Sequence, residues 1–319
     1  MGKTSADRPF QPNQAIIWFT TVAEIGDPDE ALSAMFELGY LHTEQNRHPE
    51  AIHWFTKTVE TGHPQYTPPA MLNLGYLHGS HGQYDEAIAW YTKTVETGHP
   101  ENTPSAMFNM GLLYQKQGRY DQAHFWYNQA AKTESYQASA AMLNLGYLHE
   151  MHDEAIAWYV RVIDSGHADH VPSAMFGLGS IHRRRGDYDL AVDWWTKVAE
   201  ADHQHETPSA MFNLGILHMK RQEHAMALEW FTKAVHSSHA DYTPEAMVSL
   251  GYLHDMQGRP EKACHWWHKA IESQHIEAAP KAMVNLGNHH HRQGRNDEAN
   301  AWYAKADEWG QAKSPDINR

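Results

Sequence analysis

Apolar and polar residues alternate along this chain with the spacing of short amphipathic helices, and residues 70–99 show the pattern most clearly. The first part of this stretch places Met71, Leu74 and His78 on one helix face. Gly82 follows where a left-handed residue would end that helix. A second apolar stripe consists of Ala87, Tyr91 and Val95. The stretch therefore predicts two short helices joined by a tight turn.

Start signals support this prediction. Four Thr-Pro pairs precede first helices, at Thr67-Pro68, Thr103-Pro104, Thr207-Pro208 and Thr243-Pro244. Threonine can cap free backbone N–H groups, and proline suits the first helical position. Asp85-Glu86 predict the start of the second helix, because acidic side chains favour the positive end of its dipole.

The same stretch repeats along the chain. Ala-Met dipeptides begin at residues 34, 70, 106, 141, 174, 210, 246 and 282. A tryptophan row marks the second helices at Trp18, Trp54, Trp90, Trp126, Trp158, Trp194, Trp230, Trp266 and Trp302. These spacings predict an all-α solenoid of eight antiparallel helix pairs, preceded by one unpaired helix at about residues 12–25.

The predicted domain organisation is an N-terminal tail over residues 1–12, a single solenoid over 13–309 and a C-terminal tail over 310–319. The fourth repeat, near 132–165, is irregular, because its turn has lost three residues, the turn glycine among them. We expect the stack to kink or tighten near residues 132–155. A tolerated deletion and a hinge or partner-specific feature are the two interpretations.

The repeats resemble tetratricopeptide repeats in Leu74-Gly75, in Gly82-x-Tyr84-Asp85-x-Ala87 and in Tyr91. Ala89-Trp90-Tyr91-x-Lys93 with Glu96-x-Gly98-His99, and Ala106-Met107-Phe108-Asn109, are similar to the Sel-like subfamily, although the usual insertion in its turn is missing. The resemblance implies a right-handed superhelix with first helices on the concave face. It also implies a non-catalytic role in binding peptides or assembling protein complexes.

By the family's geometry, a partner protein or peptide would contact the concave face. The predicted contact residues are Phe36, Tyr40, Leu72, Asn73, Tyr76, Phe108, Asn109, Leu143, Asn144, Tyr147, Phe176, Phe212, Asn213, Tyr252 and Asn285. Relatives that capture a carboxylate add lysine or arginine here, whereas these positions are apolar or aromatic. We therefore expect an apolar or aromatic partner segment. The alternative is that these residues pack against one another.

Both ends of the array carry large apolar residues instead of a polar capping helix, which suggests self-association. The candidates are Ile16, Ile17, Trp18 and Phe19 at one end, and Trp302, Tyr303 and Trp309 at the other. Head-to-tail contacts of this kind can propagate into a filament or tube. A self-assembling structural protein is accordingly the second functional hypothesis.

Net charge, the length of apolar runs and the cysteine count narrow the class of partner and the compartment. The 319 residues include 39 acidic and 25 basic ones, for a net charge of −14, which disfavours nucleic acid. Membrane insertion is not expected, because no apolar run approaches the ~20 residues that span a bilayer. With one cysteine and no signal-peptide pattern, we expect a cytoplasmic protein, and export without such a signal stays open.

The 26 histidines should invert the net charge between about pH 7 and pH 5, and we expect the oligomeric state to change with it.

Two histidine rows need interpretation. The turn histidines are His42, His78, His149, His182, His218, His254 and His290, which we expect to pack between helices. The loop histidines are His63, His99, His167, His203, His239 and His275, which we expect to be solvated. Equivalent residues on adjacent helices lie roughly 8–10 Å apart, too far for one metal ion to bridge. We predict no metal site, no cofactor and no catalytic residue.

The remaining rows and clusters are interpreted as packing features. We expect the tryptophans to join one repeat to the next, because each buries a large apolar area. A glycine row runs through the first helices at Gly39, Gly75, Gly111, Gly146, Gly179, Gly215, Gly251 and Gly287. It suggests a close crossing of helix backbones. The clusters His149/His152, His265/His268 and His289–His291 suit only adventitious metal binding.

Overall fold

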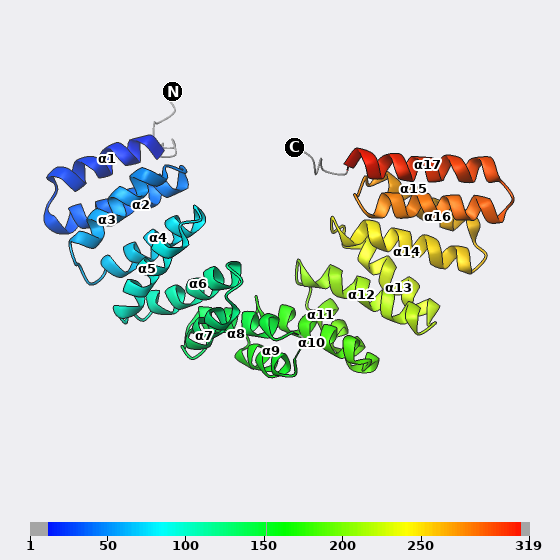
Figure 1. Cartoon of the computed structure of the whole chain (residues 1–319), viewed down its shortest axis with the longest axis horizontal. Helices are drawn as coiled ribbons and strands as arrows, with labels where there is room; N and C mark the ends of the chain where they lie inside the picture. Colours follow the sequence, from blue (N-terminus) through cyan, green and yellow to red (C-terminus); the bar gives the residue numbers. More distant parts are fainter. Residues whose placement is uncertain (1–11, 151, 314–319) are drawn as a thin grey trace, which may run out of the picture. The chain divides into compact units, whose positions relative to one another are not determined.

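The computed structural model describes residues 12–150 and 152–313, and within them it contains seventeen α-helices and no strand (Figure 1). An unpaired helix α1, Pro12–Ile25, precedes eight helix pairs. The first helices of the pairs are α2 (Pro28–Glu44), α4 (Thr67–Ser80), α6 (Asn102–Lys116), α8 (Tyr136–Leu148), α10 (Val171–Arg185), α12 (Glu206–Lys220), α14 (Tyr242–Met256) and α16 (Ala278–Arg292). The second helices are α3 (His48–Glu60), α5 (Tyr84–Glu96), α7 (Tyr120–Ala130), α9 (Glu154–Ser165), α11 (Tyr188–Glu200), α13 (His224–His236), α15 (Pro260–Glu272) and α17 (Asn296–Lys313). The predicted all-α repeat architecture is confirmed.

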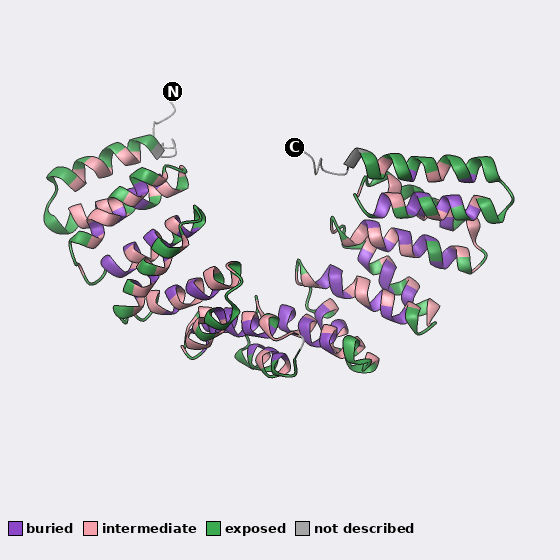
Figure 2. Ribbon diagram, viewed as in Figure 1, coloured by how far each residue is buried: buried purple, intermediate pink, exposed green. Residues whose placement is uncertain are grey.

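The chain divides into two compact units, residues 1–167 and 168–319. Within each unit every helix packs on the helix before it and the helix after it, and most neighbouring first helices, from α4 to α8 and from α10 to α16, also pack directly on one another. First helices therefore form one layer of a unit and second helices form the other. Buried residues occur along the helices of every pair, whereas the described residues of α1 are half-buried or exposed (Figure 2).

The glycine row accommodates an aromatic row. A Cβ atom added to any of the eight glycines would lie 2.3–2.6 Å from a ring atom on the second helix of the same pair. The rings belong to Phe55, Tyr91, Tyr127, Tyr159, Trp195, Phe231, Trp267 and Tyr303. The close crossing predicted from the glycines is thus a helix backbone against a ring face, and a ring separates the two backbones.

A left-handed residue shortly after the first helix explains the sharp turn in every pair except the fourth. Gly82, with φ of +75°, confirms the predicted left-handed cap. The backbone N–H of Gln83 then donates to the carbonyl of His78 at 3.0 Å, which satisfies one of the orphan carbonyls of α4. Asn46 and Gln222 take the left-handed position in the first and sixth pairs, with φ of +57° and +62°.

The prediction that threonines cap the first helices is wrong. Each helix begins at or before the threonine, so the hydroxyl lies inside the first turn. Thr207 shows its role: its hydroxyl donates to the carbonyl of Val198 at 2.9 Å and accepts from the backbone N–H of His203 at 2.8 Å. The threonine thus ties a first helix to the end of the preceding second helix.

The tryptophan row joins repeats, as predicted. Trp90 of α5 packs against a core cluster from α3 and α4, and Trp266 of α15 packs against one from α13 and α14. A cation lies 4.1–5.1 Å above seven of the rings: Lys57, Lys93, Arg161, Lys197, Lys233, Lys269 and Lys305. Cation and ring are three residues apart on one helix. Each of these seven tryptophan rings therefore also makes a cation–π contact within its own helix.

The irregular fourth pair ends its first helix at Leu148, and His149 follows with φ of −101° in place of a left-handed residue. The kink near residues 132–155 stays a prediction. The predicted N-terminal tail lies almost entirely outside the described residues, whereas α17 continues four residues beyond the predicted end of the solenoid at residue 309. No helix of the described chain is long and apolar enough to span a membrane.

Candidate functional site

The surface of the first-helix layer, which we call the first-helix face, carries most of the predicted contact residues. Its most prominent feature is a row of exposed apolar side chains at the same position of five of the eight repeats. In the first unit these are Tyr40, Tyr76, Leu112 and Tyr147, and in the second unit Tyr252. Their exposed fractions are 40–58%. Large apolar side chains in this repeated, accessible position are typical of a protein-binding surface.

One helical turn away, a second row is largely used for packing. Phe36 lies 5.8 Å from Phe55 between ring centroids, and Phe212 lies 5.7 Å from Phe231. Phe108 and Phe176 make equivalent contacts with Tyr127 and Trp195. Leu72 is half-buried. Leu143 is buried, so the structure contradicts its predicted contact with a partner. Much of this row therefore packs on the second helix of its own pair.

The predicted asparagines use their amide N–H groups inside the fold. Asn73 donates to the carbonyl of Pro69 at 2.8 Å and to the hydroxyl of Tyr40, in the preceding repeat, at 3.1 Å. Asn144 and Asn213 donate to carbonyls one turn earlier at 2.9 and 2.8 Å. Asn109 hydrogen-bonds Tyr91, whose pKa is raised by burial of the phenol. Asn73 and Asn109 therefore hold tyrosine side chains, whereas Asn144 and Asn213 bond the backbone of their own helices.

In the second unit, the first-helix face is hollowed by three pockets. A pocket of about 750 Å³ lies over α14, α16 and α17, with Val248, Val284 and Lys281 in its lining. A second, of about 340 Å³, is lined in part by Tyr252 and Asn285 between α14 and α16. A third, of about 580 Å³, lies between α12 and α14. Tyr252 lines both the second and the third pocket.

The turn histidines fall into two groups, decided by the residue five positions later. Where that residue is an acceptor, the imidazole Nδ1 is paired, as in His218 with Glu223 at 2.6 Å and His78 with Gln83 at 2.7 Å. Where it is arginine, as after His42, His254 and His290, the buried Nδ1 has no hydrogen-bond partner. Burial lowers the pKa of these three histidines, and Arg259 lowers the pKa of His254 further.

The loop histidines are half-buried and not solvated as predicted, and four of them cap the first helices. In four of them the imidazole Nδ1 accepts a hydrogen bond from a backbone N–H two residues later, at 3.2–3.3 Å: His63, His99, His239 and His275. The preceding residue has positive φ in each case, for example +64° at Gly98. An acceptor nitrogen at a helix N-terminus must be unprotonated.

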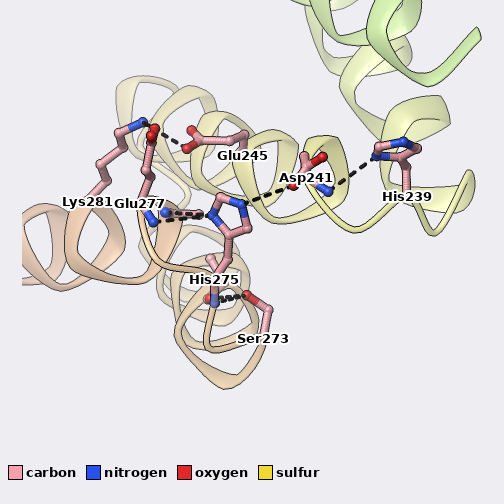
Figure 3. A network of polar contacts seen from close by, with 9 residues as sticks. His239, Asp241, Glu245, Ser273, His275, Glu277 and Lys281 are labelled. Atoms are coloured by element: carbon pink, nitrogen blue, oxygen red, sulfur yellow. Dashed lines mark hydrogen bonds and ion pairs between the residues drawn. The ribbon is translucent and has the colours of Figure 1, made fainter. Parts of the chain in front are cut away.

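Figure 3 shows one such cap in its polar network. His275 Nδ1 also accepts from the N–H of Ala278 at 3.1 Å, and its Nε2 faces Asp241 Oδ1 at 3.8 Å. Lys281 joins Glu245 and Glu277 beside it at 2.8 and 3.4 Å. Asp241 and Glu245 belong to the preceding repeat, so the network ties adjacent repeats together.

The ends of the described chain differ from each other. Ile17, Trp18 and Ile25 of α1 are 55–80% exposed, and Ile16 and Phe19 are half-buried. At the other end, Tyr303 fills the space over Gly287 and donates to Asn288 at 2.8 Å. Trp302 packs on the core beneath Lys305, and Trp309 is half-buried. The outward residues of α17 are mostly polar, so the predicted apolar C-terminal end is absent from its described side chains.

Metal-binding or nucleophilic chemistry finds little support in the described residues. They contain no group of three or more His, Cys, Asp or Glu side chains that could hold a metal ion. Burial raises the pKa of the Cys264 thiol, which disfavours the reactive thiolate. His268 Nδ1 hydrogen-bonds the backbone carbonyl of Cys264 at 2.7 Å, so the imidazole contacts the helix backbone at this residue.

A solenoid of paired helices with an aromatic face is the architecture of helical-repeat binding proteins. Models of the tetratricopeptide repeat match residues 66–133 and, separately, residues 108–170, 152–206 and 250–315. The Sel1 repeat model matches residues 32–63 and 208–239. The chain therefore belongs to the tetratricopeptide repeat family and contains Sel1-like repeats. A comparison with curated proteins finds no match.

Solved structures show the same fold. A Sel1 repeat protein from Oxalobacter formigenes is 19% identical, with a TM-score of 0.61 over 98% of this chain and 94% of that one. The C-terminal part of a tetratricopeptide repeat protein from Cytophaga hutchinsonii is 16% identical, with a TM-score of 0.57 over 75% of this chain and 98% of that one. At these identities the likeness concerns the fold alone.

Proposed function

We propose that this protein is a non-catalytic interaction scaffold that binds a segment of a partner protein along the first-helix face. The exposed tyrosine row is the observation that carries this proposal. Tyr40 shows how such a ring is held: it packs edge-on against Phe36 at 4.9 Å between ring centroids, and its hydroxyl accepts a hydrogen bond from Asn73 at 3.1 Å. Pre-ordered aromatic side chains lose little entropy on binding, which suits them to recognition.

The pockets of the second unit support an apolar or aromatic partner segment. Val248 and Val284 supply apolar walls, and Asn285 and the Tyr252 hydroxyl supply polar groups nearby. Lys281, a basic side chain in the lining of the 750 Å³ pocket, is already paired with Glu245 and Glu277. This arrangement favours side-chain insertion over capture of a terminal carboxylate. The acidic net charge supports a protein partner over nucleic acid.

Selection of peptides from a random library on the full chain tests the proposal. Affinities of the selected peptides would then be measured for Tyr76→Ala and Tyr252→Ala. We expect at least one of these variants to weaken each peptide about tenfold, because central aromatic contacts dominate such interfaces. Tyr120→Ala is the matched control, since Tyr120 is 61% exposed but lies on a second helix. Peptides that bind all three variants equally would contradict the proposal.

Self-association is the second candidate function, and the exposed Ile17 and Trp18 are the observation that favours it. Because the described part of α17 is polar outside, we restrict this candidate to contacts made through α1. Sedimentation of the full chain with and without Ile17→Ser, at pH 7 and pH 5, tests it. A monomer at every concentration and at both pH values would eliminate this candidate.

A further inference from the structure

The N-terminal end of the array contains a small pocket between α1 and α2. It has a volume of about 200 Å³ and is lined by Trp18, Phe19, Val22, Glu30, Ser33 and Ala34. Helix α1 is a second-type helix by its tryptophan, but no described helix occupies the place of its first-type partner (Figure 1). The pocket lies where that partner would pack.

The next repeat shows what fills this position. The pocket-lining residues correspond, 36 positions later, to Trp54, Phe55, Thr58, Tyr66, Pro69 and Ala70. In that repeat Phe36 of the first helix α2 lies against two of them, 5.8 Å from Phe55 and 5.6 Å from Tyr66 between ring centroids. The pocket at α1 is therefore the equivalent binding position without its aromatic side chain, and we call this pocket the seat.

Burial at the two positions supports this comparison. Phe55 and Thr58 are fully buried by their covering helix. Their counterparts Phe19 and Val22 are only half-buried, and Trp18 is 55% exposed. The apolar side of α1 thus has the composition of a helix interface and lacks the second helix.

We propose that this seat binds an amphipathic helix of another protein, which inserts a large apolar side chain and places a glycine three residues later. All eight first helices of this chain carry that spacing, as in Phe36 with Gly39 and Leu72 with Gly75. The glycine is needed because any side chain at that position would clash with the ring of the helix below. A Cβ atom added at Gly39, for example, would lie 2.5 Å from the ring of Phe55, and Phe19 is the counterpart of Phe55 in α1. This surface is separate from the first-helix face, so the proposal does not depend on the function proposed above.

The acidic residues around the pocket indicate the charge of the partner helix. Glu30 lines the pocket, and Glu24, Asp27 and Asp29 are exposed close by in the sequence. Residues 12–46 contain no lysine or arginine. A helix with basic residues next to its apolar face therefore complements this end of the molecule.

Among the described residues, every first helix is already engaged with its own second helix. Every first helix places its glycine against the ring of its own pair, so a second copy would have to open a pair to supply one. Residues 1–11 lie outside the described part, and their sequence has no glycine three residues after a large apolar residue. These observations favour a helix from a different protein.

A synthetic peptide of residues 171–186, VPSAMFGLGSIHRRRG, is a suitable probe, because it combines Phe176 and Gly179 with three arginines. Its binding to the full chain would be followed by fluorescence anisotropy of a label on the peptide. We expect saturable binding that weakens about tenfold or more when the peptide carries Phe176→Ala. Replacing the three arginines by glutamine should weaken binding severalfold, and more at low salt than at high salt.

Protein variants place the binding site. Ser33→Trp fills the pocket and should abolish binding, and Glu30→Lys should weaken it about fivefold; circular dichroism would show that both variants keep their helices. Tyr76→Ala, on the first-helix face, should leave binding unchanged, which separates this proposal from the scaffold proposal.

Four results would overturn the inference: no saturable binding, equal binding of the Phe176→Ala peptide, equal binding by Ser33→Trp, or binding that appears only after removal of residues 1–11. The last result would show that the chain itself covers the seat. A dimer that dissociates on Ser33→Trp would likewise assign the seat to a second copy of the chain.

Discussion

Gly75 of α4 lies directly against the ring of Tyr91 in α5, so closely that a Cβ atom on the glycine would be 2.4 Å from Cε1 of the tyrosine. We predict that Gly75→Ala destabilises the protein by about 1–2 kcal/mol, because overpacking outweighs the gain in helix propensity. Urea unfolding followed by circular dichroism would measure the change. The cost should fall on the second pair, since Tyr91 is 2% exposed and cannot move into solvent cheaply.

Gly79→Ala, one turn further along α4, is the matched control. A Cβ atom there would have its closest contact at 3.4 Å, with Leu113 Cδ2. Replacing a helical glycine in such a position should be neutral or stabilising by about 0.5–1 kcal/mol. If both variants lost the same stability, the close contact with Tyr91 would not be the cause.

Stability should fall as the pH is lowered through about 6.5, the pKa of an unfolded histidine. Burial lowers the pKa of His42, His254 and His290, so the unfolded chain binds more protons than the folded chain below that pH. The stabilisation is complete above the unfolded pKa and is lost between the unfolded and folded values. Urea unfolding at pH 7.5, 6.5 and 5.5 would check the direction.

The residue five positions after a turn histidine gives a specific control for this pH dependence. Arg259→Glu should give His254 the acceptor that Glu223 gives His218. It also removes a positive charge that lowers the pKa of His254, although Lys262 remains. We therefore expect Arg259→Glu to lose less stability than the parent protein between pH 7.5 and pH 5.5. An unchanged or steeper loss would contradict this account.

Much of the fold was predictable because the repeat presents the same signals many times. The tryptophan spacing placed α1 at residues 12–25 and paired the remaining helices, and Gly82 indicated the left-handed turn. Helix starts were less certain: the Thr-Pro pairs suggested caps, yet the helices begin up to one residue earlier and use the threonine hydroxyl for a contact between repeats. That contact spans nine residues and involves a backbone carbonyl, which no side-chain pattern reveals.

The candidate surface was only partly predictable. The positions of Tyr76 and Tyr252 on the first-helix face follow from helical spacing, but the exposed fraction of each row depends on neighbouring repeats. Leu143 is buried because its neighbours close over it, and the sequence gives no sign of that. The loop histidines had a usable signal, since His63 and His99 each follow a glycine at the end of a second helix. Their hydrogen bonds to backbone N–H groups required coordinates.

The third repeat lacks one member of the cation row, which allows a gain-of-stability test. Trp126 is followed three residues later by Gln129, where seven other repeats have lysine or arginine. Gln129→Lys should add a cation over the ring and stabilise the protein by about 0.5–1 kcal/mol. Asn128→Lys changes the net charge equally but points away from the ring, so the difference in urea midpoint between the two variants isolates the ring contact. Equal midpoints would argue against a stabilising role of the row.

The outer side of α17 differs from the outer side of the other second helices. Two positions of each second helix pack on the next repeat, as Ile88 and Val95 do in α5 and Leu228 and Val235 do in α13. The corresponding positions of α17 are Asn300 and Asp307, both polar. Polar residues there lower the tendency of the last helix to recruit another helix.

Placing apolar residues at these two positions of α17 should therefore make its outer side bind a second copy of the protein. We predict that Asn300→Ile combined with Asp307→Val leaves helix content unchanged but makes the protein self-associate in a concentration-dependent manner, measured by sedimentation velocity. Ala301→Ile with Glu308→Val adds the same side chains at the same spacing on exposed positions. This control should associate much less, because the corresponding residues of α15, His265 and Glu272, are also exposed and outside the core clusters. Equal association of the two variants would show that added hydrophobicity alone, and not the repeat-packing side of α17, drives the contact.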